Sequence, residues 1–347
     1  MHTMDKIIID PRIKYNYATW YIWGLAKEFG RNNIYFDIKP FESLEYNKLL
    51  QYNRGMPFVV EKGGGKLKVF IDYFDDESYE EDRYEWCDVY AKVNLTHEQL
   101  ATHIKMMEIG PSFGIRDCGV FRLIFLAFSN ILKSKGRTSM PLNRVMADYL
   151  YPYVRRRSLS DYSTRNDDVI DNYVFHLSTL WNGVKEKEQI NDVRMEFLTA
   201  CKESGINIEG GFYYIGANNE HYKQYLEEYK EFLFFNRIGL KEYLRRINKS
   251  FVVFNCPAVA GCLGWKLAEY LMMGKAIISM PINHPMPGRG LVHGDNIHIV
   301  HSKEEMKNAL CYIRDNKEYR EMLQVNAKQY FIEYLEPQKV IQRIINK

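Results

Sequence analysis

Residues 251–280, FVVFNCPAVAGCLGWKLAEYLMMGKAIISM, have the composition and spacing of a site for a phosphorylated ligand. An apolar run ends at Asn255, small residues follow it, and a helical pattern ends at Gly274 before a second apolar run. Small residues before a helix let a ligand approach the free backbone N–H groups, which together with the helix dipole favour phosphate. The residues that we predict to form this phosphate site are Asn255, Gly261, Cys262, Leu263, Gly264, Trp265 and Lys266.

Glu269 lies further along the same predicted helix. Its spacing of three or four residues from Lys266 and Trp265 places the three side chains on one helix face. A carboxylate one to two turns from a phosphate-binding helix end is well placed to accept hydrogen bonds from vicinal ribose hydroxyls. Alternatively, Glu269 pairs with Lys266 on a solvated helix face, and the spacing alone leaves both interpretations open.

Strand and helix patterns alternate in both halves of the chain. In the first half, the predicted strands are 7–9, 33–38, 68–73 and 88–93, and the predicted helix is 17–29. In the second half, the predicted strands are 173–177, 206–208, 251–254, 276–280 and 297–300, and the predicted helices are 191–203, 222–235, 261–273, 302–313 and 316–334. Such alternation is typical of parallel sheets with crossover helices. We therefore expect an α/β chain with two Rossmann-like β/α/β domains that face each other across a cleft.

A polar, basic stretch at 155–168 is the predicted linker between these domains. We expect a first domain over 1–165, a second over 170–330, and a C-terminal helix over 331–347 that packs back on the first. The stretch begins with three consecutive arginines, Arg155, Arg156 and Arg157. They form either an exposed turn or a contact for anionic lipid headgroups.

The charge balance argues against nucleic acid as a partner. The 347 residues include 47 Lys and Arg against 44 Asp and Glu, a net charge of +3, so any anion site must be local. Six scattered cysteines without a CxxC pair indicate reduced thiols, and together with the absence of a secretion signal they predict a cytoplasmic protein. The most apolar stretch, 120–132, is shorter than the roughly 20 residues of a membrane span and contains Arg122. We expect it to form a core helix.

Residues 261–279 resemble the donor-nucleotide segment of GT-B glycosyltransferases. The family pattern is Glu, Gly, an aromatic residue, Gly, four residues, Glu-Ala, Gly and an apolar strand. Gly264, Glu269 and Gly274 match its internal Gly, second Glu and helix-ending Gly. Residues 290–297, the helix start at 302–305 and the ending 326–337 are also similar to this family. The resemblance implies that Glu269 holds the ribose of a nucleotide sugar.

One position departs from the family pattern. The first Glu of the family, which contacts the donor sugar in retaining members, is Gly261 here. This departure puts both a retaining mechanism and that sugar contact in doubt.

Basic side chains rather than a metal are expected to meet the charge of the donor diphosphate. The chain has no Asp-x-Asp motif and no His, Cys or carboxylate cluster at metal-ligand spacing. The resemblance implies that basic residues of the loop and helix after Trp181 contact the diphosphate. The candidates are Lys187, expected in the loop, and Arg194, expected in the first turn of the helix. Arg289, between two glycines, is a further candidate. For each, the alternative is a solvated surface charge.

An inverting transfer needs a base for the acceptor hydroxyl. The candidates are Asp10 after the first strand, Asp72 at the end of the strand 68–73, and Glu209 before Gly210, at an expected strand end. An acid at such a position is commonly a turn or cap residue instead.

Together these features predict a metal-independent glycosyltransferase that moves a sugar from a nucleotide-sugar donor to a carbohydrate or lipid-linked saccharide acceptor. We expect the protein to be cytoplasmic, with peripheral contact at the inner face of the membrane as a possibility. A nucleotide-sugar epimerase of the same fold and a catalytically silent binding protein are the alternatives.

Overall fold

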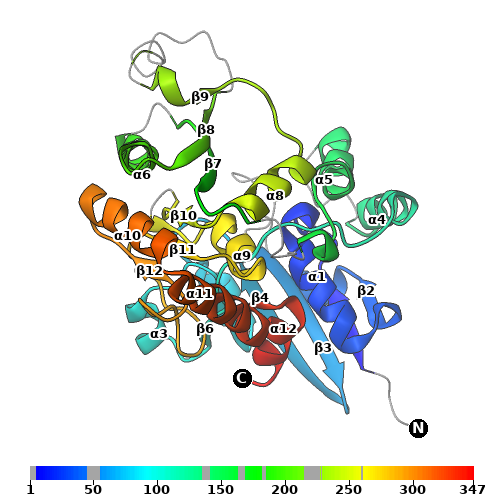
Figure 1. Ribbon diagram of the computed structural model, residues 1–347. Helices are drawn as coiled ribbons and strands as arrows, with labels where there is room; N and C mark the ends of the chain where they lie inside the picture. The colour runs from blue at the N-terminus through cyan, green and yellow to red at the C-terminus, as the bar shows by residue number, and fades with distance from the viewer. Residues whose placement is uncertain are drawn as a thin grey trace. The chain divides into compact units, whose positions relative to one another are not determined.

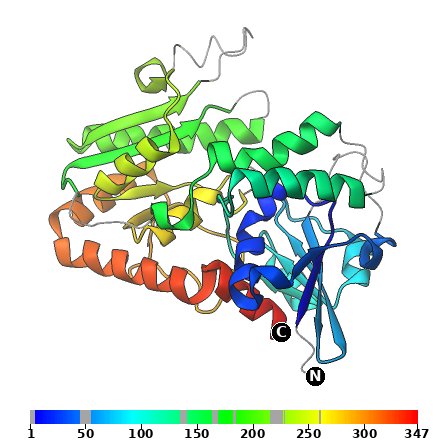
Figure 2. The same cartoon turned by 90° about the vertical axis from the view of Figure 1, so that its right-hand side faces the viewer.

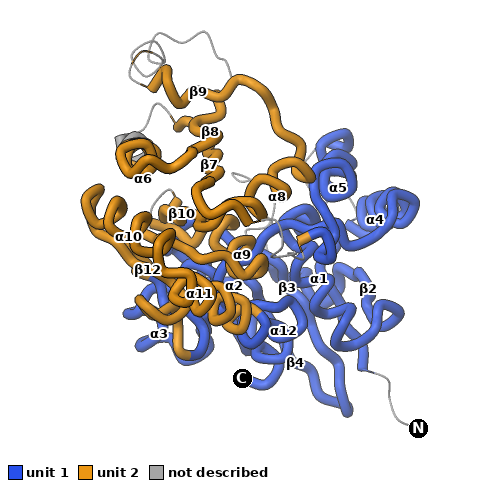
Figure 3. Tube along the Cα trace, in the orientation of Figure 1, with its two compact units in different colours: residues 1–161, 284–288, 332–347 blue, residues 162–283, 289–331 orange. Residues whose placement is uncertain are grey.

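The computed structural model describes residues 5–44, 55–134, 141–162, 169–181, 185–214, 227, 229–258 and 261–347, without the side chains of 185–188. The chain divides into two compact units (Figure 3). Unit 1 comprises Met1–Asp161, His284–Gly288 and Ile332–Lys347, and unit 2 comprises Tyr162–Asn283 and Arg289–Phe331. The division differs from the predicted boundaries in that residues 284–288 belong to unit 1. There His284 Nδ1 lies 3.0 Å from the carbonyl oxygen of Leu95.

Unit 1 contains a six-stranded sheet in the order β2-β1-β3-β4-β5-β6. The strands are β1 (Lys6–Ile9), β2 (Ile34–Phe36), β3 (Gly55–Lys62), β4 (Gly65–Asp72), β5 (Val89–Lys92) and β6 (Met106–Glu108). The pairs β1–β2, β4–β5 and β5–β6 are parallel, whereas β3 runs antiparallel to both of its neighbours. The sequence did not predict β3. It joins β4 through Gly63 and Gly64, whose φ angles of 57° and 85° suit the left-handed turn of a two-residue hairpin.

The helices of unit 1 are α1 (Tyr15–Phe29), α2 (Glu81–Trp86), α3 (His97–Thr102), α4 (Val120–Lys133), α5 (Leu142–Arg155) and α12 (Pro337–Ile345). The last helix, α12, packs along α1 (Figures 1 and 2). A Cβ at Gly24 of α1 would lie 2.3 Å from the carbonyl oxygen of Pro337, so glycine allows this close approach. Gln338 and Gln342 both donate to Glu28 Oε2. The end of the chain is therefore an integral part of unit 1.

The apolar stretch at 120–132 is helical, as predicted, but the expectation of a core helix is wrong. Only Leu123, Ala127 and Asn130 of α4 are buried, on the side where α4 packs against α5. There Asn130 Nδ2 donates to Tyr149 Oη at 2.7 Å. None of the helices among the described residues is long and apolar enough to cross a membrane.

Unit 2 contains two three-stranded parallel sheets that adjoin. One has the order β7-β8-β9 and the other β10-β11-β12. The strands are β7 (Tyr173–Thr179), β8 (Asn207–Tyr213), β9 (Leu233–Phe234), β10 (Val253–Asn255), β11 (Ile277–Ser279) and β12 (His298–Ile299).

The two sheets of unit 2 meet at β7 and β10. The N–H of Phe251 donates to the Tyr173 oxygen at 3.1 Å, and Phe175 N–H donates to Ser250 Oγ at 2.8 Å. The spatial order is therefore β9-β8-β7-β10-β11-β12. This is the strand order of a doubly wound Rossmann-like sheet, with its switch point between β7 and β10. The predicted α/β class is thus confirmed.

Helices cover both faces of the sheet in unit 2 (Figure 1). They are α6 (Lys185–Glu203), α8 (Leu240–Lys249), α9 (Trp265–Met272), α10 (Lys303–Asp315) and α11 (Lys317–Tyr330), which a π-helical segment, Phe331–Leu335, follows. On one face, Phe197 of α6 stacks on Phe254 of β10 with ring centroids 4.2 Å apart. On the other face, Phe175 of β7 contacts Tyr243 of α8.

One predicted helix in unit 2 is wrong. Within the expected helix 222–235, residues 222–226 and 228 lie outside the described residues. Lys230–Phe232 is a 3₁₀ turn, and Leu233–Phe234 is strand β9. Strand β9 pairs with β8, so sheet pairing overrides the helical spacing of the apolar residues here.

Candidate functional site

A cavity of about 210 Å³ in unit 2 lies at the carboxyl ends of β7 and β10. This is the switch point of the sheet, where ligands bind in doubly wound folds. The residues that line it are His176, Ser178, Thr179, Trp181, Arg194, Phe254, Asn255, Cys256, Ala258, Gly264, Trp265 and Lys266. Five of the predicted binding residues are among them: Arg194, Asn255, Gly264, Trp265 and Lys266.

Two basic side chains enter this cavity from different helices. Arg194 of α6 is buried, and its Nη1 donates to the Thr179 carbonyl oxygen at 3.3 Å. Lys266 of α9 is half-buried, and its Nζ donates to the Leu177 carbonyl oxygen. Among the described side chains, neither cation forms an ion pair with a carboxylate. The cavity therefore carries positive charge that the described part of the protein does not neutralise through ion pairs.

The surroundings of both cations disfavour their charged forms. Desolvation, followed by the charge of Arg194, lowers the pKa of Lys266 to about 7, and nearby Glu269 offsets part of this effect. Desolvation also lowers the pKa of Arg194. An anion that enters the cavity would stabilise both charges.

His176 and Ser178 add polar groups to the cavity, and the sequence reasoning missed both. His176 Nδ1, His176 Nε2 and Ser178 Oγ are buried atoms that have no hydrogen-bond partner within the described ranges. Desolvation, and then the charges of Lys266 and Arg194, hold the pKa of His176 well below its usual value, so its ring is neutral at pH 7. The position of these residues at the end of the first strand of unit 2, beside the expected switch point, could have identified them.

Backbone hydrogen bonds link Ala258 to Gly261 and Cys262 ahead of α9. The N–H of Ala258 donates to the Cys262 oxygen, and Gly261 N–H donates to the Ala258 oxygen, both at 3.0 Å. Helix α9 begins only at Trp265, with Gly264 as an N-cap that has no side chain to cap the first turn. The predicted helix start at 261 is therefore four residues too early.

Gly261 is exposed and has a φ of +70°, which disfavours a glutamate at this position. Cys262 and Leu263, also predicted to bind the ligand, are buried, and neither is among the described residues that line the cavity. Asn255 is held in place because its Nδ2 donates to Ser279 Oγ at 2.9 Å. Asn255 and Gly264 thus line the cavity, whereas Gly261 is not among its described lining residues.

Glu269 is a buried residue on α9, one turn after Lys266. Desolvation has the largest effect on the pKa values of Lys266, Tyr243 and Tyr270, and the charge of Glu269 in addition favours the protonated form of each. Glu269 is not among the described residues that line the cavity. The alternative of a solvated Glu269–Lys266 pair is wrong, since Glu269 is buried and Lys266 donates to Leu177.

The remaining basic candidates lie elsewhere or are not described at the side chain. Lys187 lies near the start of α6, not in a loop, and its side chain is outside the described atoms. Arg194 lies near the middle of α6, not in its first turn. Arg289 forms an ion pair with Asp295, with Nη1 and Oδ2 2.6 Å apart, and does not line the cavity in the described part of the chain.

Glu209 does not end a strand. Strand β8 continues through Gly210 and Gly211, where a Cβ would lie 2.1 Å from the His176 oxygen and 2.0 Å from the Phe232 oxygen, respectively. The two glycines therefore allow β8 to pack closely against its neighbours, and they do not form a turn. The Glu209 carboxylate accepts hydrogen bonds from Tyr173 and Arg246.

The two candidate bases of unit 1 are fully buried. Asp10 pairs with Arg12, with Oδ2 and Nη2 2.7 Å apart. Asp72 Oδ2 lies 3.1 Å from Lys92 Nζ and accepts a hydrogen bond from Tyr90 Oη at 2.8 Å. Both carboxylates are inaccessible to a substrate hydroxyl in this conformation, which favours structural roles.

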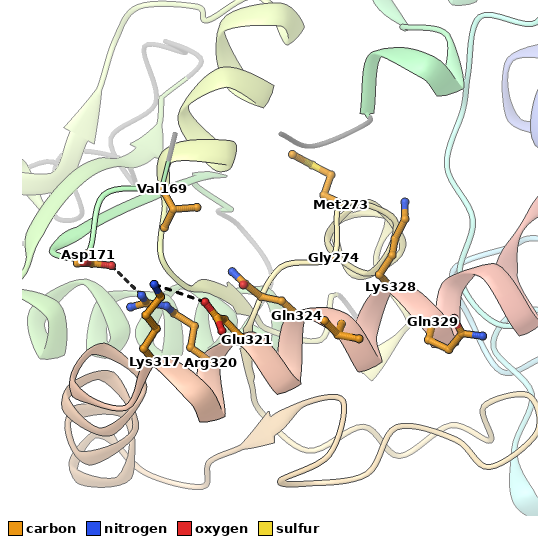
Figure 4. Close-up of a pocket in the computed structure, with 11 residues that line it drawn as sticks. Val169, Asp171, Met273, Gly274, Lys317, Arg320, Glu321, Gln324, Lys328 and Gln329 are labelled. Carbon is orange, nitrogen blue, oxygen red and sulfur yellow. Dashed lines mark hydrogen bonds and ion pairs between the residues drawn. The ribbon is translucent and has the colours of Figure 1, made fainter. Parts of the chain in front are cut away.

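A larger cavity of about 620 Å³ lies at the opposite, amino-terminal edge of the sheet in unit 2, beside Asp171 and Gly274. Two ion pairs lie along it (Figure 4), and Lys328 donates to the Met272 carbonyl oxygen. Arg320 Nη2 lies 2.7 Å from Asp171 Oδ1, and Lys317 Nζ lies 3.7 Å from Glu321 Oε1. Carboxylates thus offset most of the positive charge of this cavity, whereas no carboxylate is among the described residues that line the switch-point cavity.

No group of three or more His, Cys, Asp or Glu side chains within the described residues is arranged to hold a metal ion. The charged groups of the switch-point cavity are cationic, so they suit an anion rather than a cation.

No protein-family model and no curated protein match the chain. Among solved structures, HepE from Anabaena in complex with UDP and glucose is 12% identical, covers 80% of this chain and 70% of its own, and has a TM-score of 0.46. A glycosyltransferase from Rickettsia africae is 10% identical, with 80% and 69% covered and a TM-score of 0.42. The C-terminal domain of the glycosyl transferase group 1 family protein LpcC from Francisella tularensis is 14% identical, with 50% and 95% covered and a TM-score of 0.37. At these TM-scores the matches do not fix the fold, which follows from the strand order of unit 2.

Proposed function

We propose that this chain is a glycosyltransferase whose unit 2 binds the diphosphate of a nucleotide-sugar donor between Arg194 and Lys266. The observation that carries the proposal is the pair of cations at the switch point of a doubly wound sheet, neither of which pairs with a carboxylate in the described part of the chain. The diphosphate of a nucleotide sugar carries one negative charge on each phosphate. Its charge therefore matches that of the two cations.

The polar groups around these cations suit the same ligand. Neutral His176 can donate one ring N–H, and Ser178 Oγ can donate its hydrogen, to phosphate oxygens. The uncapped start of α9 adds backbone N–H groups and the positive end of the helix dipole. When the sugar is transferred, negative charge grows on the departing diphosphate, and these fixed donors would stabilise it. The proposed site therefore needs no metal ion.

Glu269 is proposed to hold the ribose, as the family resemblance implies. Its place one turn further along α9 from Lys266 supports a contact with the part of the nucleotide next to the diphosphate. The acceptor is proposed to be a saccharide or a lipid-linked saccharide, reached from the cytoplasmic side of a membrane. Unit 2 is proposed to carry the donor, and unit 1 to contribute to the acceptor side.

Isothermal calorimetry with a graded ligand series tests the proposal. Titrations with UDP, GDP, CDP and dTDP identify the nucleotide base that the protein prefers. The affinities of the nucleoside, the monophosphate and the diphosphate of that base then show how much each phosphate contributes to binding. We expect the diphosphate to bind at least tenfold more tightly than the monophosphate, because each cation makes charge-assisted hydrogen bonds. Arg194→Gln should remove most of this difference. The control is Arg314→Gln, at a partly exposed arginine that pairs with Asp315, and it should leave the difference unchanged.

Product analysis with the matching nucleotide sugar separates the enzymatic alternatives. Transfer or slow hydrolysis that releases free nucleoside diphosphate supports a transferase. Interconversion of the nucleotide sugar without release indicates an epimerase. If no nucleotide of the series binds, the proposed function is wrong, and a silent binding protein is the better description.

A further inference from the structure

Helix α4 exposes a continuous row of large apolar side chains on the side opposite its contact with α5. Phe121, Phe125, Phe128 and Leu132 are 86%, 70%, 53% and 78% exposed. They recur at spacings of four, three and four residues, so they form one stripe along the helix, which we call the α4 stripe. Exposing aromatic groups of this size to water is unfavourable and marks a surface that meets an apolar partner.

The neighbouring helix α5 extends this apolar character. It packs beside α4 (Figure 2) and exposes Leu142, Tyr151, Tyr153 and Val154. The Arg156 guanidinium lies over the Tyr151 ring, 5.1 Å from its centroid. A cation held against an exposed aromatic ring is typical of residues at a membrane interface, where the ring enters the headgroup region and the charge meets phosphate.

The same segment is strongly basic, although the whole chain has a net charge of only +3. Residues 120–157 contain a single acid, Asp148, whose Oδ2 is buried. The basic residues of this segment are Arg122, Lys133, Lys135, Arg137, Arg144, Arg155, Arg156 and Arg157. Of those that the structure describes, Arg122, Lys133, Arg144 and Arg155 are exposed. Positive charge thus accompanies the apolar stripe.

We propose that α4 and α5 dock unit 1 on a lipid bilayer that carries anionic headgroups. The α4 stripe would enter the boundary between headgroups and acyl chains, and the basic side chains would contact lipid phosphates. At 14 residues, α4 is about 21 Å long, too short to cross a hydrocarbon core of about 30 Å, so it lies along the surface. Charge complementarity favours this occupant over a second copy of the chain, because two such basic surfaces repel each other.

The docking surface rests on unit 1 alone and is independent of the nucleotide site proposed in unit 2. A protein that failed to bind nucleotide could still bind vesicles through α4, and the reverse also holds. The two proposals are therefore tested separately on the same preparation.

Vesicle co-sedimentation of the full chain tests the docking surface. The probes are vesicles of phosphatidylcholine alone and of phosphatidylcholine mixed with phosphatidylglycerol. We expect binding to the mixed vesicles to be at least tenfold tighter, and to weaken as salt screens the headgroups. The double variant Phe125→Ser/Phe128→Ser should lose at least tenfold in affinity for the mixed vesicles. The double variant Arg155→Gln/Arg157→Gln should weaken binding and reduce its salt dependence.

Ile104→Ser is the matched control, because Ile104 is 90% exposed in unit 1 outside both helices. It should bind vesicles like the unchanged protein. Circular dichroism and calorimetric nucleotide titration check that the variants remain folded. Three results would each overturn the proposal. The first is equal affinity for the two vesicle types, and the second is unchanged vesicle binding of the phenylalanine variant. The third is a protein that does not bind vesicles but self-associates, with a self-association that Phe125→Ser abolishes. The last result would assign the surface to a second copy of the chain.

Discussion

Arg194 and Lys266 reach the carboxyl end of β7 from opposite faces of the sheet in unit 2. Arg194 comes from α6 and donates to the Thr179 oxygen, and Lys266 comes from α9 and donates to the Leu177 oxygen. The two charges repel each other across the cavity. Carbonyl oxygens relieve this repulsion only in part, because they carry no full charge. An arrangement of this kind is unfavourable for stability and becomes favourable when an anion enters, which is typical of binding sites rather than of structural ion pairs.

The first prediction separates binding from stability at Arg194. Arg194→Gln should weaken nucleoside diphosphate binding by about 10- to 100-fold, the equivalent of roughly 1.5–3 kcal/mol for charge-assisted hydrogen bonds. The melting temperature of the ligand-free protein should stay the same or rise, because the substitution removes a desolvated charge without an acidic partner. Calorimetric titration and thermal melting measure the two effects. A lower melting temperature with unchanged affinity would assign Arg194 a structural role instead.

The second prediction concerns the pH dependence of binding at Lys266. Its pKa in the free protein is about 7, and a bound phosphate should raise it. Between these two values, binding takes up a proton, so the affinity should weaken by up to about tenfold per pH unit above pH 7. Titrations from pH 7 to 9 in Tris and in HEPES, whose ionisation enthalpies differ, measure the uptake directly. His176 does not interfere, because its pKa is held far below this range.

The variant Lys266→Met provides the control for this pH effect. It should bind nucleoside diphosphate more weakly than the unchanged protein and with no proton uptake in this range. Lys317→Met, at a lysine that pairs with Glu321 in the other cavity of unit 2, should keep the full pH dependence. Proton uptake that persists in Lys266→Met would mean that another group titrates on binding.

The third prediction tests the role of Glu269. If Glu269 holds ribose, Glu269→Gln should weaken nucleoside diphosphate binding by about 10- to 100-fold and leave the affinity for inorganic diphosphate unchanged. If it acts only through Lys266, whose charged form it favours, both affinities should fall together. The pH above which binding weakens should then also move down. Parallel titrations with the two ligands distinguish these outcomes.

Most of the framework around the site could be predicted from sequence, because strand, glycine and helix spacing are local properties. The strand before Asn255, the helix that ends before Gly274 and the strand that follows were all predicted, and each is present. Strand β3 was missed because Pro57 disfavours a central strand, yet it lies between β1 and β4. Helix boundaries were less accurate where a turn competes, as at Gly261.

Burial could not be predicted, because it depends on the elements that pack against each residue. Spacing alone cannot show that Arg194 is buried with no carboxylate partner in the part of the chain that the structure describes, or that Asp10 and Asp72 are buried within unit 1. The same limit explains α4. Its sequence is apolar around most of its circumference, and only the fold shows that one side meets α5 while Phe121 and Phe125 are exposed.

The fourth prediction concerns Asp72, which the sequence had offered as a catalytic base. Its carboxylate is fully buried against Lys92 and Tyr90, so Asp72→Asn should leave the Lys92 ammonium without its counter-charge. Breaking a buried pair on one side typically costs about 3–5 kcal/mol of stability. Differential scanning calorimetry should therefore show a clearly lower unfolding temperature. The double variant Asp72→Asn/Lys92→Met should regain much of the loss, because it also removes the unpaired cation. A catalytic base would behave differently, since Asp72→Asn would then keep its unfolding temperature and its nucleotide affinity but lose sugar transfer.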